Sequence, residues 1–521
     1  MLSVKIENLR SVVDTGFIDI KPLTVLLGIN SSGKSTFLRL FPLIKQSLEA
    51  KTKGPILWFG NHVDFGSFKE ALNRNSTENT ISLSFKLNQT KKDYNSLNQW
   101  TPSGKRMNVL KDIDIVIRLN ITGGQKEYDS RVSSLSLCFF GHTIEISIDE
   151  ADMLQSMHIN GVDVTGSLPP AIYCFQTGFL PAFYEIVKNQ EQSRAVNMID
   201  DSTYLISRAS AAIKKILHHR AGAETIAKTT TSLSVGSSED MLSNLKSNRH
   251  GGETLKNQTQ SWSTKTPFYI TIQNIILSRF TFELSSRVNI MLNDIARSVH
   301  YIKPLRATGE RYYRPQDLSI DEVDSQGRNL PMFLFNLTHT EKVRLNDWVS
   351  SLMGFYPAIK YSEGHMSMRI GVAGNEDSFN IADSGFGYSQ ILPIIVQVWH
   401  SINGARDQLY KNKSQSIVAI EQPELHLHPR MQAKLADMFA ASIDKKKFSS
   451  STSFVIETHS EVFVNRLGHL IAAGRLSHSD VNIIIFEYDK KSNGSTIRIA
   501  EFDNNGMLNN WPHGFFEPSI I

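Results

Sequence analysis

The chain has 521 residues, of which 40% are apolar, and its 55 basic residues nearly balance its 51 acidic ones. This composition predicts a folded protein of about three average domains and does not indicate a strongly basic nucleic-acid binder. The first ten residues lack the apolar core of a signal peptide and no window approaches the ~20 apolar residues of a membrane span, so we expect a soluble protein with no membrane partner. The two cysteines, Cys138 and Cys174, cannot make a disulfide framework, which favours the reducing cytoplasm.

The first 27 residues read as short strands, the last of which, Leu23–Leu27, leads into Gly28–Ser35. This octapeptide fits G-x-x-x-x-G-K-[ST], and the helix-compatible run 36–48 follows it, which is the strand, loop and helix context of a P-loop. The glycines let backbone N–H groups face phosphate oxygens at a helix N-terminus, Lys34 reaches the β- and γ-phosphates, and Ser35 ligates Mg²⁺. We therefore predict ATP and Mg²⁺ as cofactors. The candidate ATP-binding residues are Gly28, Asn30, Ser31, Ser32, Gly33, Lys34, Ser35 and Thr36.

The middle of the chain separates two halves of the predicted ATPase core. Residues 1–76 form the first half, and short β-rich runs over 77–185 predict a β-rich extension of this lobe. Residues 186–294 predict a helical insertion, within which 221–267 is rich in Ser, Thr, Asn and Lys and is typical of a flexible arm. The second half of the core is expected over 295–521.

A second chemical motif follows the apolar run Ser416–Ile420. It begins with Glu421 and corresponds to the Walker B position, where a strand ends at the ligand-binding edge of the sheet. Glu421 is expected to hold Mg²⁺ through water together with Ser35, because a hard divalent cation prefers carboxylate oxygen and keeps several waters. The alternative is an acid that caps the following helix.

Four segments together resemble the SMC/OLD-like ABC-type ATPases of bacteria. They are Asn30–Thr36, Glu421–Pro429, Glu457–Glu461 and Trp511–Phe516. The last of them is similar to the ending of a subfamily with a short characteristic C-terminal domain, which includes or borders the ATPases of retron and Septu anti-phage systems. The resemblance covers about 1–75 and 295–521. It implies an α/β fold, namely a P-loop ABC-type ATPase with a mixed sheet flanked by helices, a β-rich N-terminal lobe and a long helical or flexible insertion.

The resemblance also implies head-to-tail dimers that sandwich ATP, in which a signature segment of one subunit contacts the γ-phosphate bound by the other. The segment 384–390 is the candidate, because small residues before an apolar helix expose N–H groups and hydroxyls to a phosphate. It departs from the common Leu-Ser-Gly-Gly-Gln. The residues expected to act in trans are Ser384, Gly385, Gly387, Ser389 and Gln390.

The predicted catalytic residues are Glu421, Gln422, Glu424 and His459. His459 resembles the switch histidine that reaches the γ-phosphate in these ATPases, and a core or capping histidine is the alternative. Gln422 lies where ABC ATPases usually place the glutamate that orients the attacking water, and an amide cannot act as a base. Either Glu424 takes over this role, or hydrolysis is slow and ATP mainly holds the dimer together. We expect slow turnover with Glu424 assisting.

Two further pairs carry weaker signals. His426 and His428 have no third ligand at zinc-binding spacing, so we expect them to pack structurally. Arg306 and Arg311 lie in the charged and aromatic segment 304–313, which resembles a family element. This segment is either solvated surface or a contact to phosphate or nucleic acid.

Three functions are compatible with these features. The first is a sensor or regulatory ATPase of an anti-phage defence complex, with an HNH-type nuclease or another toxin as partner and a reverse transcriptase with its nucleic acid as a further candidate; this depends on resemblance alone. The second is a DNA-repair ATPase like RecF or the SMC proteins, although 77–295 lacks long heptads. The third is a nuclease like the OLD proteins, but only about 60 residues follow His459, fewer than an average domain. We expect the first.

Overall fold

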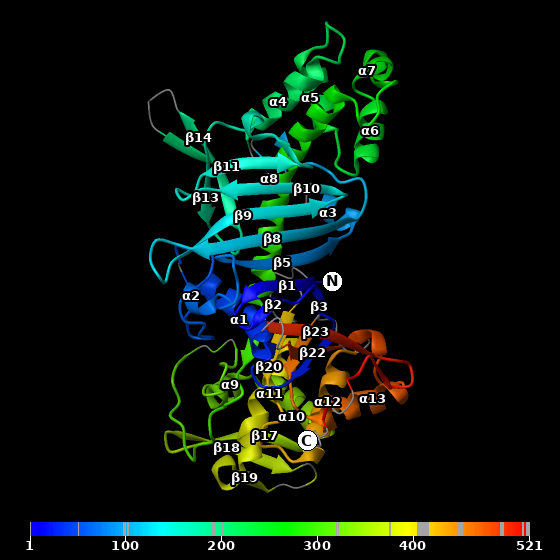
Figure 1. Cartoon of the computed structure of the whole chain (residues 1–521). Coiled ribbons are helices and arrows are strands. Elements are labelled where there is room, and N and C mark those ends of the chain that lie inside the picture. The colour runs from blue at the N-terminus through cyan, green and yellow to red at the C-terminus, as the bar shows by residue number, and fades with distance from the viewer. Residues whose placement is uncertain are drawn as a thin grey trace.

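The computed structural model describes residues 2–50, 52–96, 100–101, 104–188, 194–199, 202–318, 320, 322–372, 374, 377–403, 416–444, 452–489, 494–512 and 515–516. Within these residues the fold is α/β and is built around one large mixed sheet, with helices on both of its faces (Figure 1). The order of its strands along the main path is β12-β11-β10-β9-β8-β5-β1-β2-β23-β22-β4-β21-β20-β16.

The strands nearest the predicted site are parallel. β4 (Leu23–Gly28) lies between β21 (Thr452–Glu457) and β22 (Val481–Asp489), and β20 (Ser416–Glu421) lies between β21 and β16 (Val299–Ile302). Every residue of β4 and β21 is buried. Their continuous apolar runs are explained by this position, because parallel strands are covered on both faces.

Two hydrophobic cores lie on opposite faces of these strands. Ile417 and Ala419 of β20 pack in the core that contains α1 (Lys34–Glu49) and α8 (Pro267–Arg297). The alternate residues of the strand pack in the other core, which contains a different set of helices. Successive side chains of a strand point to opposite faces, so a residue two positions after Ala419 points toward α1. The helices of the second core are α9 (Leu330–Asn336), α10 (His339–Met353), α11 (Phe386–Asn403), α12 (Pro429–Ser442) and α13 (Glu461–Ala472).

Most of the β-rich stretch 77–185 continues the main sheet as an antiparallel ladder, which lies in the upper half of Figure 1 below the helices at its top. In its strand β8, alternate residues from Ile113 to Ile121 are buried and their neighbours are more exposed. This alternation is typical of a strand with one covered face, and the buried side chains belong to the core that contains α8. The ladder consists of β1 (Leu2–Leu9), β5 (Thr80–Gln89), β8 (Ile113–Gly123), β9 (Ser130–Phe139), β10 (His142–Ile148), β11 (Leu154–Ile159) and β12 (Val162–Asp163).

The segment 221–267 differs from the flexible arm that its composition predicts. It contains α5 (Ala223–Thr231), α6 (Ser238–Lys246) and α7 (Gly252–Thr259), which lie with α4 (Thr203–Lys214) beyond the far end of the ladder (Figure 1). The few large apolar residues of the segment, such as Leu245 and Leu255, are buried in the core with α8. Its polar residues cap the helices instead of preventing them: the Ser237 hydroxyl accepts a hydrogen bond from the Asp240 N–H at 3.2 Å.

Of the other described elements, β2, β3, β23 and β24 belong to or pair with the main sheet, and the rest are short helices or form small separate sheets. No helix in the described part of the chain is long and apolar enough to cross a membrane. The remaining bounds are β2 (Val12–Asp14), β3 (Ile18–Asp19), α2 (Phe68–Ala71), α3 (Lys91–Ser96), β6 (Trp100–Thr101), β7 (Gly104–Lys105), β13 (Ile172–Gln176), β14 (Pro181–Lys188), β15 (Arg194–Met198), β17 (Phe355–Ser362), β18 (His365–Val372), β19 (Ser378–Asn380), β23 (Gly494–Phe502) and β24 (Leu508–Asn509).

Candidate active site

The predicted P-loop connects β4 to α1 at the carboxyl end of the central parallel strands. Gly28 and Gly33 have φ angles of 145° and 101°, values that residues with a Cβ rarely adopt. A Cβ on Gly28 would lie 2.2 Å from the carbonyl oxygen of Phe486 on the neighbouring strand, so the close approach of β22 also requires glycine. α1 begins at Lys34, directly after the loop. The loop therefore leads into a helix N-terminus, which favours a bound anion.

The amino group of Lys34 lies inside this loop. The side chain is only 3% exposed, and Nζ donates hydrogen bonds to the carbonyl oxygens of Gly28 at 3.0 Å and Ile29 at 2.7 Å. Burial lowers the pKa of Lys34, and the charges of Glu457 and Glu424 oppose this effect. The position fits the predicted role of Lys34 toward phosphate, because the cation is held where the loop closes.

Ser35, the predicted magnesium ligand, contacts Glu457. Its Oγ donates a hydrogen bond to Oε1 of Glu457 at 2.9 Å, and Nζ of Lys34 lies 3.9 Å from the same oxygen. Burial raises the pKa of Glu457; the Ser35 hydrogen bond opposes this shift, whereas the charge of Glu421 adds to it. The sequence interpretation assigned no role to Glu457. The sequence does offer one signal for such a role: Glu457 is an acid at the end of an apolar strand, β21, just as Glu421 is at the end of β20.

Glu421 itself is held by two other side chains. Nε and Nη2 of Arg39 donate hydrogen bonds to its two carboxylate oxygens, each at 2.7 Å, and the hydroxyl of Tyr301 donates to Oε1 at 2.6 Å. The hydrogen bonds to Glu421 raise the pKa of Arg39. Arg39 follows Ser35 by one helical turn, so both face the same side of α1. Tyr301 carried no comparable signal in the sequence.

The capping alternative for Glu421 is wrong. α12 begins at Pro429, and its N-cap is His428, whose ring nitrogen accepts a hydrogen bond from the N–H of Arg430 at 3.2 Å. His426 packs against the ring of Phe386, with 5.1 Å between the ring centroids. In the described residues no group of three or more His, Cys, Asp or Glu side chains could hold a metal ion. His428 thus caps a helix and His426 packs against an aromatic ring.

Gln422 occupies a strained turn after β20. Its φ angle is 43°, its N–H donates to the carbonyl oxygen of Glu457 at 2.8 Å, and its own carbonyl oxygen accepts from Nη2 of Arg306 at 3.2 Å. Nη2 of Arg306 also donates to the carbonyl oxygen of Glu421 at 2.8 Å. Arg306 is only 5% exposed, so the solvated-surface alternative is wrong for this residue, whereas Arg311 pairs with Asp383 at the surface.

Glu424 and His459 lie next to each other behind this turn. The N–H of His459 donates a hydrogen bond to Oε1 of Glu424 at 2.7 Å. Burial raises the pKa of Glu424, and burial followed by the charge of Lys34 lowers the pKa of His459. The structure therefore gathers the P-loop lysine, two buried carboxylates and the predicted switch histidine at one edge of the sheet.

Comparison of the sequence with protein families shows to which family the chain belongs. The family described as AAA ATPase domain matches residues 1–464, which include the P-loop, Glu421 at the end of β20 and Glu424 after it. The chain belongs to this family. A second family, described as a protein of unknown function (DUF3696), matches residues 476–519 of the ATPase. His513 and Gly514 of the characteristic ending lie outside the described residues.

Among solved structures, the ATPase is similar to head domains of SMC proteins. The Smc head domain of Pyrococcus furiosus has 11% sequence identity, a TM-score of 0.34, and coverage of 96% of this chain and 97% of that chain. The SMC head domain from Thermotoga maritima has 6% identity, a TM-score of 0.34, and coverage of 95% and 97%. These overall similarities are low, and the family assignment rests on the sequence match. No curated protein matches the chain.

The site of this ATPase fits ATP with a divalent cation. Buried polar atoms without partners are rare in proteins. Oγ of Ser32 and Oε2 of Glu457 are buried atoms of this kind, with no hydrogen-bond partner in the part of the chain that the structure describes. Both belong to the surroundings of the P-loop, where phosphate oxygens and a cation are their natural partners. Mg²⁺ usually takes only one or two protein ligands, so a cation at this site would also bind oxygen atoms of the nucleotide.

The candidate signature segment of the ATPase begins α11. Gly385 is exposed, Ser384 and Gly387 are partly exposed, and Ser389 is buried. Gln390 is buried too, and its Nε2 donates to the carbonyl oxygen of Arg306 at 3.2 Å within the same subunit. Ser384, Gly385 and Gly387 are therefore accessible to a second subunit. Ser389 and Gln390 are not, which contradicts their expected action in trans.

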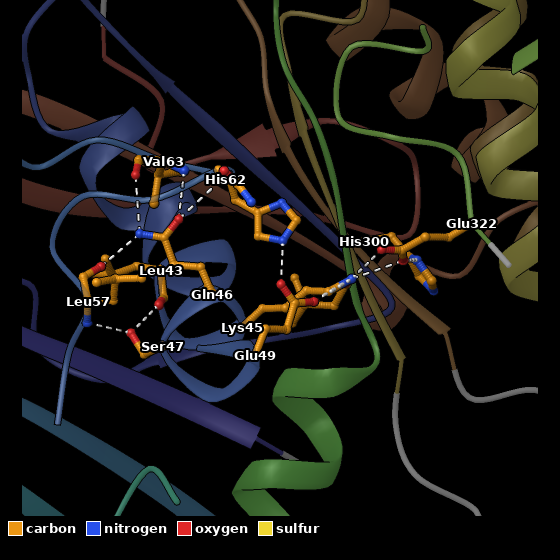
Figure 2. A network of polar contacts seen from close by, with 12 residues as sticks. Leu43, Lys45, Gln46, Ser47, Glu49, Leu57, His62, Val63, His300 and Glu322 are labelled. Atoms are coloured by element: carbon orange, nitrogen blue, oxygen red, sulfur yellow. Dashed lines mark hydrogen bonds and ion pairs between the residues drawn. The ribbon is translucent and has the colours of Figure 1, made fainter. Parts of the chain in front are cut away.

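A polar network ties α1 of the ATPase to β16 and to the chain beyond it (Figure 2). Nζ of Lys45 donates to the carbonyl oxygen of Val299 at 2.8 Å and to both carboxylate oxygens of Glu322 at 2.8 and 2.9 Å. Nδ1 of His300 lies 2.9 Å from Oε2 of Glu322. The helix that carries Ser35 and the strand that carries Tyr301 are thus fixed to each other.

Proposed function

We propose that this ATPase is the sensor or regulatory subunit of a bacterial anti-phage defence complex. In this proposal the ATP-bound head-to-tail dimer restrains or releases a partner effector, which is an HNH-type nuclease or another toxin. The single observation that carries the proposal is a complete P-loop site in which Gln422 occupies the water-activating position. Such a site suits a slow switch better than a motor, because a long-lived ATP state gives a partner time to recognise it.

The proposed chemistry divides between binding and slow hydrolysis. Bound Mg²⁺ would neutralise charge on the phosphates and favour displacement at the γ-phosphate. The loop N–H groups and Lys34 would bind the phosphates, and the His459 side chain would contact the γ-phosphate. The amide of Gln422 cannot accept a proton, so Glu424, whose buried carboxyl lies beside His459, would accept it from the attacking water at a slow rate.

A phage-plating assay tests the defence role. The gene is expressed with its natural neighbours in a phage-sensitive bacterial host, as wild type and as Lys34→Ala. We expect wild type to reduce plating and Lys34→Ala to lose protection, because the cation that the loop holds for phosphate is removed. Lys69→Ala, which changes an exposed lysine of α2, is the matched control and should protect like wild type.

Two results would contradict the proposal. One is protection by Lys34→Ala at the wild-type level, provided that the variant is folded and does not bind labelled ATP. The other is a wild-type protein that leaves phage plating unchanged but increases survival of DNA damage. This second result would favour the DNA-repair function.

A further inference from the structure

Two buried carboxylates end adjacent parallel strands at the nucleotide site. Glu421 of β20 and Glu457 of β21 are register partners, and both are almost completely buried. Register partners on parallel strands point to the same face of the sheet, and the contacts of both residues with α1 identify that face. Each carboxylate is therefore a candidate ligand for the cation that accompanies ATP, although only Glu421 occupies the motif position.

The two carboxylates differ in what already binds them. Both oxygens of Glu421 accept hydrogen bonds from the Arg39 guanidinium, and one also accepts from the Tyr301 hydroxyl. Glu457 receives one hydrogen bond, from Ser35, and its Oε2 has no hydrogen-bond partner among the described residues. The Arg39 guanidinium thus occupies both oxygen atoms of Glu421, whereas at Glu457 the Lys34 amino group lies 3.9 Å from Oε1 and Oε2 stays without a hydrogen bond in the described part of the chain.

Physical chemistry favours the second carboxylate. A cation that bound Glu421 would have to displace a two-point guanidinium contact, and breaking a buried ion pair is costly because it leaves a charge without its partner. Glu457 requires no such exchange. The Ser35 hydroxyl that contacts it is a donor with two further lone pairs, so one oxygen can contact the carboxylate and the cation together. Mg²⁺ commonly takes one or two protein ligands of this type in addition to phosphate oxygens and water.

We propose that Glu457, together with Ser35, is the carboxylate that directly receives the divalent cation of the nucleotide in this protein. Glu421 remains paired with Arg39 and Tyr301 and acts as a positioning residue that fixes α1 to β20 and β16. The inference rests on the ATPase site and is independent of the proposed defence role, so failure of either leaves the other intact.

Binding of Mn²⁺ tests this assignment without measuring hydrolysis. Mn²⁺ takes the same oxygen ligands as Mg²⁺ and is visible by electron paramagnetic resonance. Its affinity is measured for the full chain saturated with a non-hydrolysable ATP analogue. We expect Glu457→Gln to weaken Mn²⁺ affinity about 10-fold or more, since even residues that only orient metal ligands contribute roughly 10–100-fold. The Glu421 carboxylate is hydrogen-bonded to Arg39 and Tyr301 and not to the proposed ligands Ser35 and Glu457. Glu421→Gln should therefore change the affinity less than about 3-fold, below the range for residues that orient metal ligands.

A double variant and a binding control sharpen the result. Arg39→Met in a Glu457→Gln background frees Glu421, so this double variant should recover part of the lost Mn²⁺ affinity. A fluorescent ATP analogue is also bound to each variant in EDTA, which removes divalent cations. Its affinity should be similar in all variants, which verifies that they are folded. Unchanged Mn²⁺ affinity in Glu457→Gln, or a larger loss in Glu421→Gln, overturns the assignment. If Glu457→Gln does not fold, Glu421→Gln decides alone: wild-type affinity supports the assignment, and a 10-fold loss rejects it.

Discussion

At Gln422 the backbone determines the shape of the turn after β20, whereas the side chain affects the chemistry of the site. Its φ of 43° lies in the left-handed region, which costs on the order of 1–3 kcal/mol for a residue with a Cβ. Hydrogen bonds from Arg306 and to the Glu457 carbonyl oxygen hold this turn on both sides. The backbone is thus over-determined, so a change of side chain at 422 should leave the turn in place and affect mainly the chemistry.

Exchange of amide and carboxylate at the two neighbouring positions should change the rate of hydrolysis in opposite directions. We expect Gln422→Glu to accelerate steady-state phosphate release, because it supplies an acceptor for the proton of the attacking water. Glu424→Gln should slow release if Glu424 is the substitute base. General-base assistance changes rates by a factor on the order of 10²–10⁴, so either change in the rate of phosphate release should greatly exceed the error of the measurement.

Binding of labelled ATP is the control for both variants and should resemble that of wild type. Fast wild-type turnover that is unaffected by Glu424→Gln would contradict the assignment and require a third residue as the base.

Among the elements, α1 contacts the greatest variety of site components. Its first turn carries Lys34 and Ser35, its second carries Arg39, and its fourth carries Lys45, which pairs with Glu322. The network in Figure 2 therefore fixes the position of the P-loop helix from the end opposite to the nucleotide. Burial alone would raise the pKa of Glu322, but the hydrogen bond with His300 and the charge of Lys45 outweigh it and lower the pKa to about 2.

Glu322→Gln should destabilise the protein in a pH-dependent manner. A carboxyl whose pKa is lower in the folded state, here about 2 against the ordinary value of 4.5, stabilises the fold at pH values above the ordinary pKa. The contribution is lost as pH falls from that value toward 2. The side chain is 37% exposed, so after solvent screening we expect a loss of about 1 kcal/mol at pH 7.

Thermal unfolding of Glu322→Gln and wild type between pH 7 and pH 3 measures this effect. The difference in melting temperature should be constant above pH 5 and should narrow below it. Glu253→Gln, at an exposed glutamate of α7, is the control and should match wild type throughout. A difference that grows as the pH falls would have the wrong sign.

At the scale of the whole molecule, several large apolar side chains near the site are exposed. Ile29 of the P-loop is 62% exposed, Leu305 is 68% exposed, and Phe386 at the start of α11 is 48% exposed. Aromatic and large apolar side chains are enriched in the centres of protein interfaces. This distribution supports the proposal that a second subunit covers the ATP site and that 384–387 faces its nucleotide.

Gly385→Arg should prevent ATP-dependent dimerisation without unfolding the chain. A Cβ at Gly385 would meet no atom within 4 Å, so the substitution is tolerated in the monomer but places a bulky charge on the predicted interface. Gly166→Arg, also in open space, is the matched control on the β-rich lobe. Light scattering with Mg²⁺ and ATP should show dimers for wild type and Gly166→Arg and monomers for Gly385→Arg. A monomeric wild type, or a dimeric Gly385→Arg, would contradict the proposed dimer.

Local patterns were sufficient for the parts of the site that are contiguous in the chain. The P-loop, the buried strand before it and the acids after β20 could all be predicted, because each depends on residues within about one strand or turn. The folded segment 221–267 could not, because its helices depend on packing of a few apolar side chains against α8. The partner of Ser35 was equally inaccessible: Ser35 and Glu457 are 422 positions apart, and their contact requires the strand order that places β21 beside β4. Arg39 and Tyr301 reach Glu421 for the same reason, since the packing of α1 and β16 against β20 determines which carboxylate the guanidinium and the phenol bind.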